Sequence, residues 1–227
     1  MNPLLVAHGT RKTDGVAMIA DLAERVGVVL GQPVRTSFVD VLGPTPADVL
    51  TSLPNGLAVV VPAFLASGYH VRTDVPAFVE ASGHPNVVVT EALGPSTHVV
   101  RVMVDRLVES GWRPSDSVIM AAAGTSDDHA RRDLRITAAL LSAAIGSRVE
   151  LAYAATGEPR VADAVAALRS GGAPRVVVAS YLVADGLFQD RLRTSGADLV
   201  TEPLGTHPGI VRLIASRFRR ARLPITV

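Results

Sequence analysis

The sequence contains no cysteine. Disulfide bonds, iron–sulfur clusters and thiolate zinc sites are therefore excluded, which leaves histidine and carboxylate side chains as metal ligands. An excess of one charge is also lacking, because 22 basic residues nearly balance 21 acidic ones. Nucleic acids and anionic membranes attract broadly basic proteins, so we expect neither as a partner. Any charged ligand must be bound by a local patch.

Long hydrophobic runs are absent as well. The longest, Leu57 to Ala66, has 10 residues and contains Pro62, whereas a membrane-spanning helix needs roughly 20. The first residues show no basic segment followed by a long apolar stretch and a cleavage site, so no signal peptide is predicted. We therefore expect a cytoplasmic protein that does not associate with membranes.

Apolar residues are nevertheless abundant, at 48% of the 227 residues. This length fits one large α/β domain or two domains of about 110 residues each. Strand-like apolar runs alternate with helical patterns along the chain. In the first half, strands are predicted at residues 4–7, 34–39, 58–62 and 87–90, and helices at about residues 19–29, 46–50, 75–81 and 96–110.

The second half repeats this order. Strands are predicted at residues 118–122, 149–154, 176–180 and 199–201, and helices at about residues 128–145, 161–168 and 208–219, with a loop at 185–186. Similar residues recur in the same order in the two halves: residues 9–10 match 124–125, residues 64–65 match 181–182, residue 68 matches 186, and residues 91–94 match 202–205. We therefore predict an α/β fold with two similar doubly wound lobes, 1–113 and 114–227, each a flavodoxin-type four-stranded parallel sheet flanked by helices.

Polar side chains follow the ends of three predicted strands in the first lobe. His8 follows the first strand, Asp40 closes the second, and His70 lies a few residues beyond the third. In doubly wound sheets the ligand binds beyond the carboxyl ends of the strands, where strand order reverses. Neutral imidazole binds Fe²⁺, Co²⁺, Ni²⁺ and Zn²⁺. The sequence therefore predicts an open divalent-metal site with two or three protein ligands among His8, His70 and Asp40, since an Asp after a strand is also an ordinary turn residue.

Local cations surround this predicted site. Arg11, Lys12 and Arg72 could hold a polyanionic ligand, although exposed cations are more often merely solvated. Gly9 and Gly68 have no side chain and would let a flat ligand approach the backbone closely.

Two motifs in this region carry a family resemblance. Leu4–Arg11 (LLVAHGTR) and Pro62–Pro76 (PAFLASGYHVRTDVP) resemble the sirohydrochlorin chelatase family, a group of class II tetrapyrrole chelatases. The resemblance covers nearly the whole chain, because the family includes fused two-domain members whose second lobe is similar to residues 116–220. It implies a chelatase-like fold in which lobe 1–113 is catalytic. Lobe 114–227 would be a degenerate repeat, since Ala123 and Phe188 stand where the first lobe has the two histidines.

The resemblance implies a lyase that inserts a divalent metal into sirohydrochlorin without ATP. Iron would lead to sirohaem and cobalt to cobalamin. His8 and His70 match the family's two active-site histidines, and Asp40 stands where an acidic residue commonly assists. Imidazole can both coordinate the metal and accept a pyrrole proton, so which histidine does which stays open. No tightly bound cofactor is expected, because Fe²⁺, Co²⁺ or Ni²⁺ is itself a substrate.

Sirohydrochlorin has eight carboxylates, which Arg11, Lys12 and Arg72 would contact, whereas Gly68 and Tyr69 would lie against the ring. We favour iron as the metal, with cobalt as the alternative. Single-lobe members of the family form homodimers, so the second lobe would replace the partner, and we expect a monomer that is an internal pseudo-dimer.

The sequence also bears on three other functions. A non-enzymatic carrier of metal or tetrapyrrole could use the same two histidines. Histidine phosphatases also have a strand followed by a His-Gly-Thr sequence, but Ala7 stands where they need an arginine to bind phosphate. A flavodoxin-like nucleotide-binding module is disfavoured because no glycine-rich phosphate loop follows any strand.

Overall fold

The structure is a computed structural model in which residues 1–221 are described. Residues 222–227, which the sequence assigns to the end of the second lobe, lie outside the described residues. Strands and helices alternate along the first half of the chain: β1 Asn2–Ala7, α1 Thr13–Leu30, β2 Arg35–Phe38, α2 Pro46–Thr51, β3 Ala58–Pro62, η1 His70–Asp74, α3 Val75–Ser82, β4 Val87–Val89 and α4 Thr97–Glu109.

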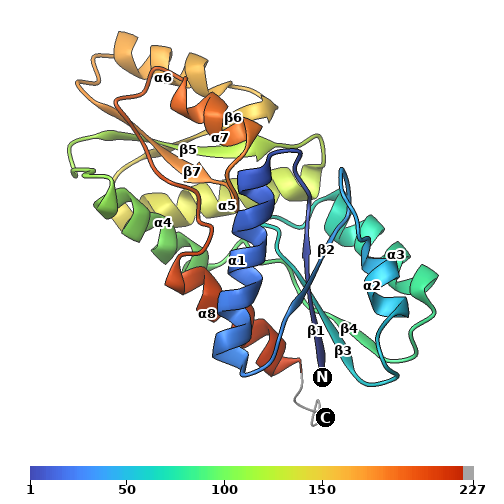
Figure 1. Cartoon of the computed structure of the whole chain (residues 1–227). Helices are drawn as coiled ribbons and strands as arrows, with labels where there is room; N and C mark the ends of the chain where they lie inside the picture. Colours follow the sequence, from blue (N-terminus) through green and yellow to red (C-terminus); the bar gives the residue numbers. More distant parts are fainter. Residues whose placement is uncertain (222–227) are drawn as a thin grey trace. The chain divides into compact units, whose positions relative to one another are not determined.

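The second half has the same alternation (Figure 1). Its elements are β5 Ser117–Gly124, α5 Asp128–Ile145, β6 Val149–Thr156, α6 Val161–Ser170, β7 Val176–Tyr181, α7 Leu187–Arg193, β8 Leu199–Val200 and α8 Pro208–Arg220. The strands form two parallel four-stranded sheets, in the orders β2-β1-β3-β4 and β6-β5-β7-β8. This confirms the predicted fold class of two flavodoxin-type sheets flanked by helices.

Strand position in each sheet follows from the apolar pattern. All five residues of β3 are buried, because a central parallel strand is covered by helices on both faces. At the edge of the same sheet, Val88 and Val89 of β4 are exposed. Among the described residues, no helix combines the length and the apolar character needed to cross a bilayer.

Contacts divide the chain into two compact units that do not coincide with the sequence repeat. Unit 1 consists of Met1–Leu93 and the described residues from Thr206 onward, and unit 2 is Gly94–Gly205. Helix α8 packs on α1 and β3 in unit 1, whereas α4 packs on α5 and β7 in unit 2 (Figure 1). The boundary expected near residue 113 therefore differs from the packing. The last helix of each repeat buries its apolar face against the other repeat's sheet.

Candidate metal and tetrapyrrole site

The candidate site lies at the carboxyl edge of the unit 1 sheet, between its two central strands. Strands β1 and β3 are direct parallel neighbours, with Val6 opposite Pro62. The Ala63 N–H continues the pairing by donating to the Val6 carbonyl at 2.7 Å. The loops that follow β1 and β3 therefore leave the sheet side by side, at the point where strand order reverses.

These two loops bring together the predicted histidines. The ring centres of His8 and His70 are 4.7 Å apart, and the rings are perpendicular. His8 is exposed, and the side chain of His70 is 33% exposed. Both rings can therefore be reached from solvent while standing within range of one ion.

Hydrogen bonds indicate which nitrogen of each ring carries the proton. Nδ1 of His8 lies 3.2 Å from the Gly9 carbonyl oxygen, and Nδ1 of His70 lies 2.6 Å from Oδ2 of Asp74. A carbonyl oxygen and a carboxylate can only accept, so each Nδ1–H is the donor. A neutral ring in this tautomer keeps its lone pair on Nε2, ready to bind a metal or a proton.

Asp74 was not among the sequence-predicted site residues. The signal for it was present, because an acidic residue four positions after a histidine falls on the same face of a helical turn. The sequence predicts a loop for residues 70–74, and in a loop the spacing of four residues does not imply a contact. In the structure residues 70–74 form the π-helical turn η1.

Asp40 lies on the neighbouring loop, which follows β2. Its N–H donates to the His8 carbonyl at 3.0 Å, and its Oδ1 accepts from the Val41 N–H at 2.7 Å. Within residues 1–221, no three His, Asp or Glu side chains are grouped closely enough to hold a metal ion. The two imidazoles thus converge, and the role of Asp40 as a third ligand stays a prediction.

Gly9 allows the His8 and Asp40 loops to lie this close. Its φ is +103°, a conformation that side chains disfavour, and a Cβ at this position would overlap the carbonyl oxygen of Asp40. Val41 adds local strain, because it is a β-branched residue with φ of +70°. Such strain is often concentrated at functional sites.

The predicted substrate-binding residues are on the same two loops. Arg11 and Lys12 stand between β1 and α1, and both are exposed. Arg72 is exposed on η1, where its N–H donates to the Gly68 carbonyl at 3.1 Å. Tyr69 is 58% exposed. The structure therefore places three cations and an exposed aromatic ring on the loops that carry the histidines.

Aromatic rings stand against the histidine pair. The ring centre of Phe64 is 6.5 Å from that of His8 and 6.0 Å from that of His70. The Tyr69 ring is 6.1 Å from His70, edge to face. The imidazoles therefore have an apolar border suited to a flat, partly apolar ligand.

The carboxyl edge of the unit 2 sheet has a similar backbone conformation but lacks the two histidines. Gly124 has φ of +108°, and a Cβ there would overlap the backbone of Thr156, just as one on Gly9 would overlap Asp40. This match aligns Ala123 with His8 and Thr156 with Asp40. Phe188, which aligns with His70, is 38% exposed.

The strand register corrects one predicted correspondence between the repeats. Val6 pairs with Pro62 and Ala121 with Ser180, so Phe64 corresponds to Leu182 and not to Tyr181. The hydrogen bonds from Leu93 to the Phe64 carbonyl and from Leu204 to the Leu182 carbonyl give the same alignment. With this one-residue shift, Gly68 matches Gly186 without an insertion.

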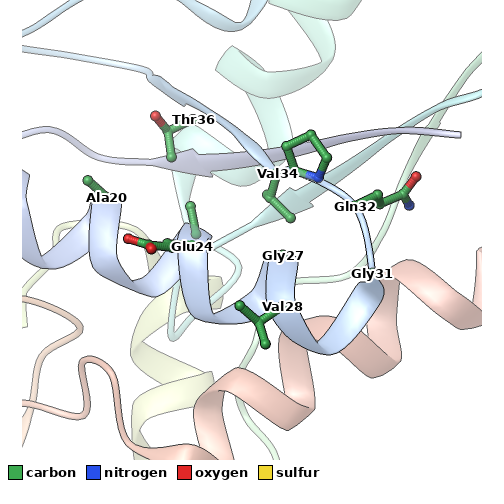
Figure 2. Close-up of a pocket in the computed structure, with 10 residues that line it drawn as sticks. Ala20, Glu24, Gly27, Val28, Gly31, Gln32, Val34 and Thr36 are labelled. Atoms are coloured by element: carbon green, nitrogen blue, oxygen red, sulfur yellow. The ribbon is translucent and has the colours of Figure 1, made fainter.

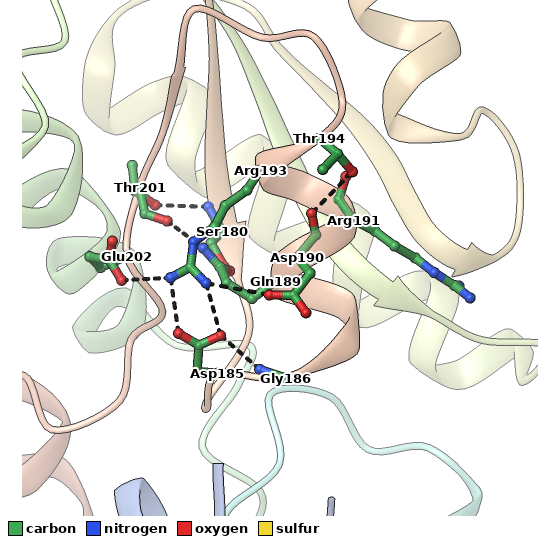
Figure 3. Close-up of polar contacts among 10 residues, drawn as sticks. All are labelled: Ser180, Asp185, Gly186, Gln189, Asp190, Arg191, Arg193, Thr194, Thr201 and Glu202. Atoms are coloured by element: carbon green, nitrogen blue, oxygen red, sulfur yellow. Dashed lines mark hydrogen bonds and ion pairs between the residues drawn. The ribbon is translucent and has the colours of Figure 1, made fainter. Parts of the chain in front are cut away.

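In unit 2 the loop after β7 is braced by ion pairs (Figure 3). Arg193 donates to both carboxylate oxygens of Asp185, at 3.0 and 2.9 Å, and to Glu202 at 3.1 Å. Behind it, the Ser180 hydroxyl donates to Gln189 at 2.7 Å, and the Gln189 amide donates to the Thr201 carbonyl at 2.9 Å. These contacts brace a turn in which Phe188 stands at the position of His70.

A hollow elsewhere in unit 1 does not suit a polyanion. Figure 2 shows it between α1 and the segment that leads into β2, with Val28 and Gln32 on its walls. Among its described lining residues the only charged one is Glu24, which is acidic. None of the predicted site residues lines it.

A duplicated flavodoxin-type fold with one solvent-accessible histidine pair at a carboxyl edge defines the class of chelatase-like proteins. The family model described as CbiX matches the chain twice, over residues 2–110 and 117–221. The chain therefore belongs to the CbiX family, which confirms the resemblance to sirohydrochlorin chelatases seen in the motifs. No curated protein sequence matches the chain.

Solved structures show the same fold. SirB from Bacillus subtilis with Fe³⁺ has a TM-score of 0.79 and 21% identity, covering 97% of this chain and 95% of that one. The sirohydrochlorin chelatase SirB from Bacillus subtilis subspecies spizizenii in complex with cobalt has a TM-score of 0.75 and 22% identity, with the same coverage of 97% and 95%. CbiX, the terminal enzyme for siroheme biosynthesis in denitrifying bacteria, has a TM-score of 0.72 and 19% identity, covering 99% of this chain and 100% of that one.

Proposed function

We propose that this protein inserts Fe²⁺ into sirohydrochlorin, without ATP, in the synthesis of sirohaem. The observation that carries the proposal is the histidine pair, with ring centres 4.7 Å apart and both Nδ1 atoms bonded to acceptors. Membership of the CbiX family supports the substrate class. The reaction would take place in the cytoplasm, in a monomer.

The spacing of the two rings suits a shared ion. If each ring placed Nε2 about 2.1 Å from a metal, the ring centres would be about 4.5–5.2 Å apart for ligand angles of about 90–110°. The separation of 4.7 Å between His8 and His70 falls within this interval. Two protein ligands leave the other coordination positions open to water and to the nitrogens of the macrocycle, as transfer of the ion requires.

Metal insertion replaces two pyrrole N–H protons with one divalent ion, so two protons must leave. As the ion moves to the macrocycle, it releases the Nε2 atoms of His8 and His70, and each freed imidazole can then accept a proton and pass it to water. Asp40, beside His8 on the next loop, would supply a negative charge that attracts the hydrated cation.

The substrate would be held by its periphery. Arg11, Lys12 and Arg72 would pair with carboxylates of sirohydrochlorin, since guanidinium and ammonium groups form charge-assisted hydrogen bonds with them. Tyr69 would contact the ring, and Gly68 would let it approach the backbone. No second reaction centre is proposed in unit 2, because Ala123 and Phe188 replace the histidines.

Iron is proposed as the metal because one similar structure contains Fe³⁺ and another is described as an enzyme of siroheme biosynthesis. Cobalt, leading to cobalamin, is the second candidate, because another similar structure is a complex with cobalt. Imidazole ligands alone do not discriminate between these ions, so rates have to be compared directly.

The test is an anaerobic assay with sirohydrochlorin and Fe²⁺, Co²⁺ or Ni²⁺, without ATP, followed by absorbance. We expect multiple turnovers, fastest with Fe²⁺, and a loss of at least about 100-fold in His8→Ala and His70→Ala. His129→Ala is the control, because that histidine is exposed on α5 in unit 2. Wild-type rates in both site variants would disprove the site.

The same assay separates an enzyme from a carrier. A carrier would bind metal or macrocycle in stoichiometric amounts without raising the insertion rate above the uncatalysed background. If the protein leaves that background rate unchanged for every metal, the chelatase proposal fails and the carrier function replaces it.

A further inference from the structure

The turn that carries His70 is firmly anchored. At its start, the Gly68 carbonyl accepts hydrogen bonds from the N–H groups of Val71 and Arg72, both at 3.1 Å. At its end, the Val75 N–H donates to the His70 carbonyl, and the Val75 side chain is completely buried in the unit 1 core. The backbone of His70 is therefore fixed, which leaves the rotation of its ring to be determined.

One side chain forms a hydrogen bond with the ring. Oδ2 of Asp74 lies 2.6 Å from Nδ1 of His70, a short charge-assisted hydrogen bond. The two side chains are only 33% and 25% exposed, so water competes less for the bond than at an open surface.

We infer that Asp74 is a positioning residue that keeps the His70 proton on Nδ1 and so presents the Nε2 lone pair to the metal. This inference rests on the proposed function, because it takes His70 as a metal ligand. A carboxylate bonded to the far nitrogen of a ligating histidine fixes the tautomer and orientation of the ring and strengthens its donor nitrogen.

Unit 2 offers an internal comparison. Phe188 occupies the position of His70, and four residues later stands Leu192, whose side chain is completely buried. The turn can thus be built with an apolar residue at that spacing. Where there is no imidazole to orient, the carboxylate is absent.

The competing explanation is an ordinary ion pair on a helical turn, which adds little to stability. That role would change folding slightly and metal binding not at all. Asp74→Asn distinguishes the two, because it preserves shape but replaces a carboxylate, which can only accept, with an uncharged amide that can also donate. The amide NH₂ group can donate to Nδ1 and stabilise the wrong tautomer, with the proton on Nε2.

The test uses the full chain without sirohydrochlorin. Co²⁺ is titrated into wild type, Asp74→Asn, His70→Ala and the control Glu80→Gln, whose residue is exposed on α3, and both Kd and the visible spectrum of bound Co²⁺ are recorded. We expect Asp74→Asn to bind Co²⁺ about 10–100-fold more weakly with an altered spectrum, and Glu80→Gln to match wild type.

The outcomes separate the two proposals. If His70→Ala binds Co²⁺ as wild type does, the ligand assignment of the proposed function fails. If His70→Ala loses binding while Asp74→Asn keeps the wild-type Kd and spectrum, only the positioning role fails.

A second measurement does not depend on folding of a variant. The ¹⁵N chemical shifts of the His70 ring in the metal-free wild-type protein report which nitrogen is protonated. We expect the Nδ1–H tautomer, and an Nε2–H tautomer would overturn the inference.

Discussion

Replacing Gly9 with alanine is expected to reduce both stability and activity, whereas the same change at Gly124 should reduce stability alone. The two glycines occupy matching positions, with φ of +103° and +108°. A Cβ on Gly9 would overlap the carbonyl oxygen of Asp40, and one on Gly124 would overlap the backbone of Thr156. The two substitutions therefore impose nearly the same local perturbation on two similar units.

The free-energy cost of placing alanine at these positions can be estimated from the backbone dihedral angles. A non-glycine residue in a sparsely populated region costs about 1–3 kcal/mol, and separating the two overlapping loops adds to this cost. For a unit of this size, that corresponds to a fall of about 4–15 °C in the unfolding midpoint. Both variants should show such a fall in thermal unfolding followed by circular dichroism.

Activity should separate the variants. Gly9 adjoins His8, so moving its loop away from Asp40 displaces a proposed metal ligand, and a displacement of about 1 Å costs about 100-fold in rate. At a temperature where both variants are folded, Gly9→Ala should lose most of the chelatase rate and Gly124→Ala should retain it. Equal rates in the two variants, or an unchanged midpoint in either, would refute this reasoning.

Three further predictions follow from the same structure. Phe218→Ala, in α8, should lower the free energy of unfolding by about 3–5 kcal/mol and increase hydrogen exchange in β1 and β3. Leu107→Ala, in α4, should instead increase hydrogen exchange in β5 and β7. The opposite pattern would contradict the division into units. Hydrogen bonds from the cap residue of α2 lower the pKa of Asp48 below 3.8. The stability that these hydrogen bonds provide is complete above pH 3.8 and is lost as the pH falls through the lower pKa of Asp48 in the folded state. The urea midpoints of wild type and Asp48→Asn should therefore converge in acid and diverge at neutral pH. The double variant Ala123→His, Phe188→His should add a second, weaker Co²⁺ site per chain, which equilibrium titration would count; unchanged stoichiometry would argue against the alignment of the two edges.

Much of the fold could be predicted from sequence because its central strands are apolar on both faces. The predicted bounds of the strand at residues 58–62 agree with β3, and those of the helix at residues 128–145 agree with α5. Both segments have strong periodicity or continuous burial, which local patterns reveal. The convergence of His8 and His70 followed from the same topology, since neighbouring strands bring their loops together.

Two short helices were missed, and both follow a central strand at the carboxyl edge. The turn η1 has five residues and α7 has seven, too few for helical periodicity to be recognised. Helices this short are unstable alone and depend on tertiary contacts, such as the buried hydrogen bonds of Gln189. The spacing of His70 and Asp74 indicates a contact only if residues 70–74 are helical, and five residues are too few to show this.

The sequence also does not indicate which sheet the last helix of each repeat packs against. Helices α4 and α8 each have one apolar face, and such a face specifies burial but not against which sheet. The sequence repeat ends after each of these helices, whereas the packing units begin before α4 and resume before α8. A duplicated chain can exchange equivalent helices without any change in local pattern, because both sheets offer similar surfaces.

The two carboxyl edges differ in their side chains and hardly at all in their backbone. Their strand order is the same, and each has a glycine at positive φ packed against the next loop. What differs is the side chains: an imidazole pair with a carboxylate partner in unit 1, and alanine with phenylalanine in unit 2. Because the same backbone carries an imidazole pair in one unit and none in the other, the proposed metal binding depends on His8, His70 and the groups that orient them.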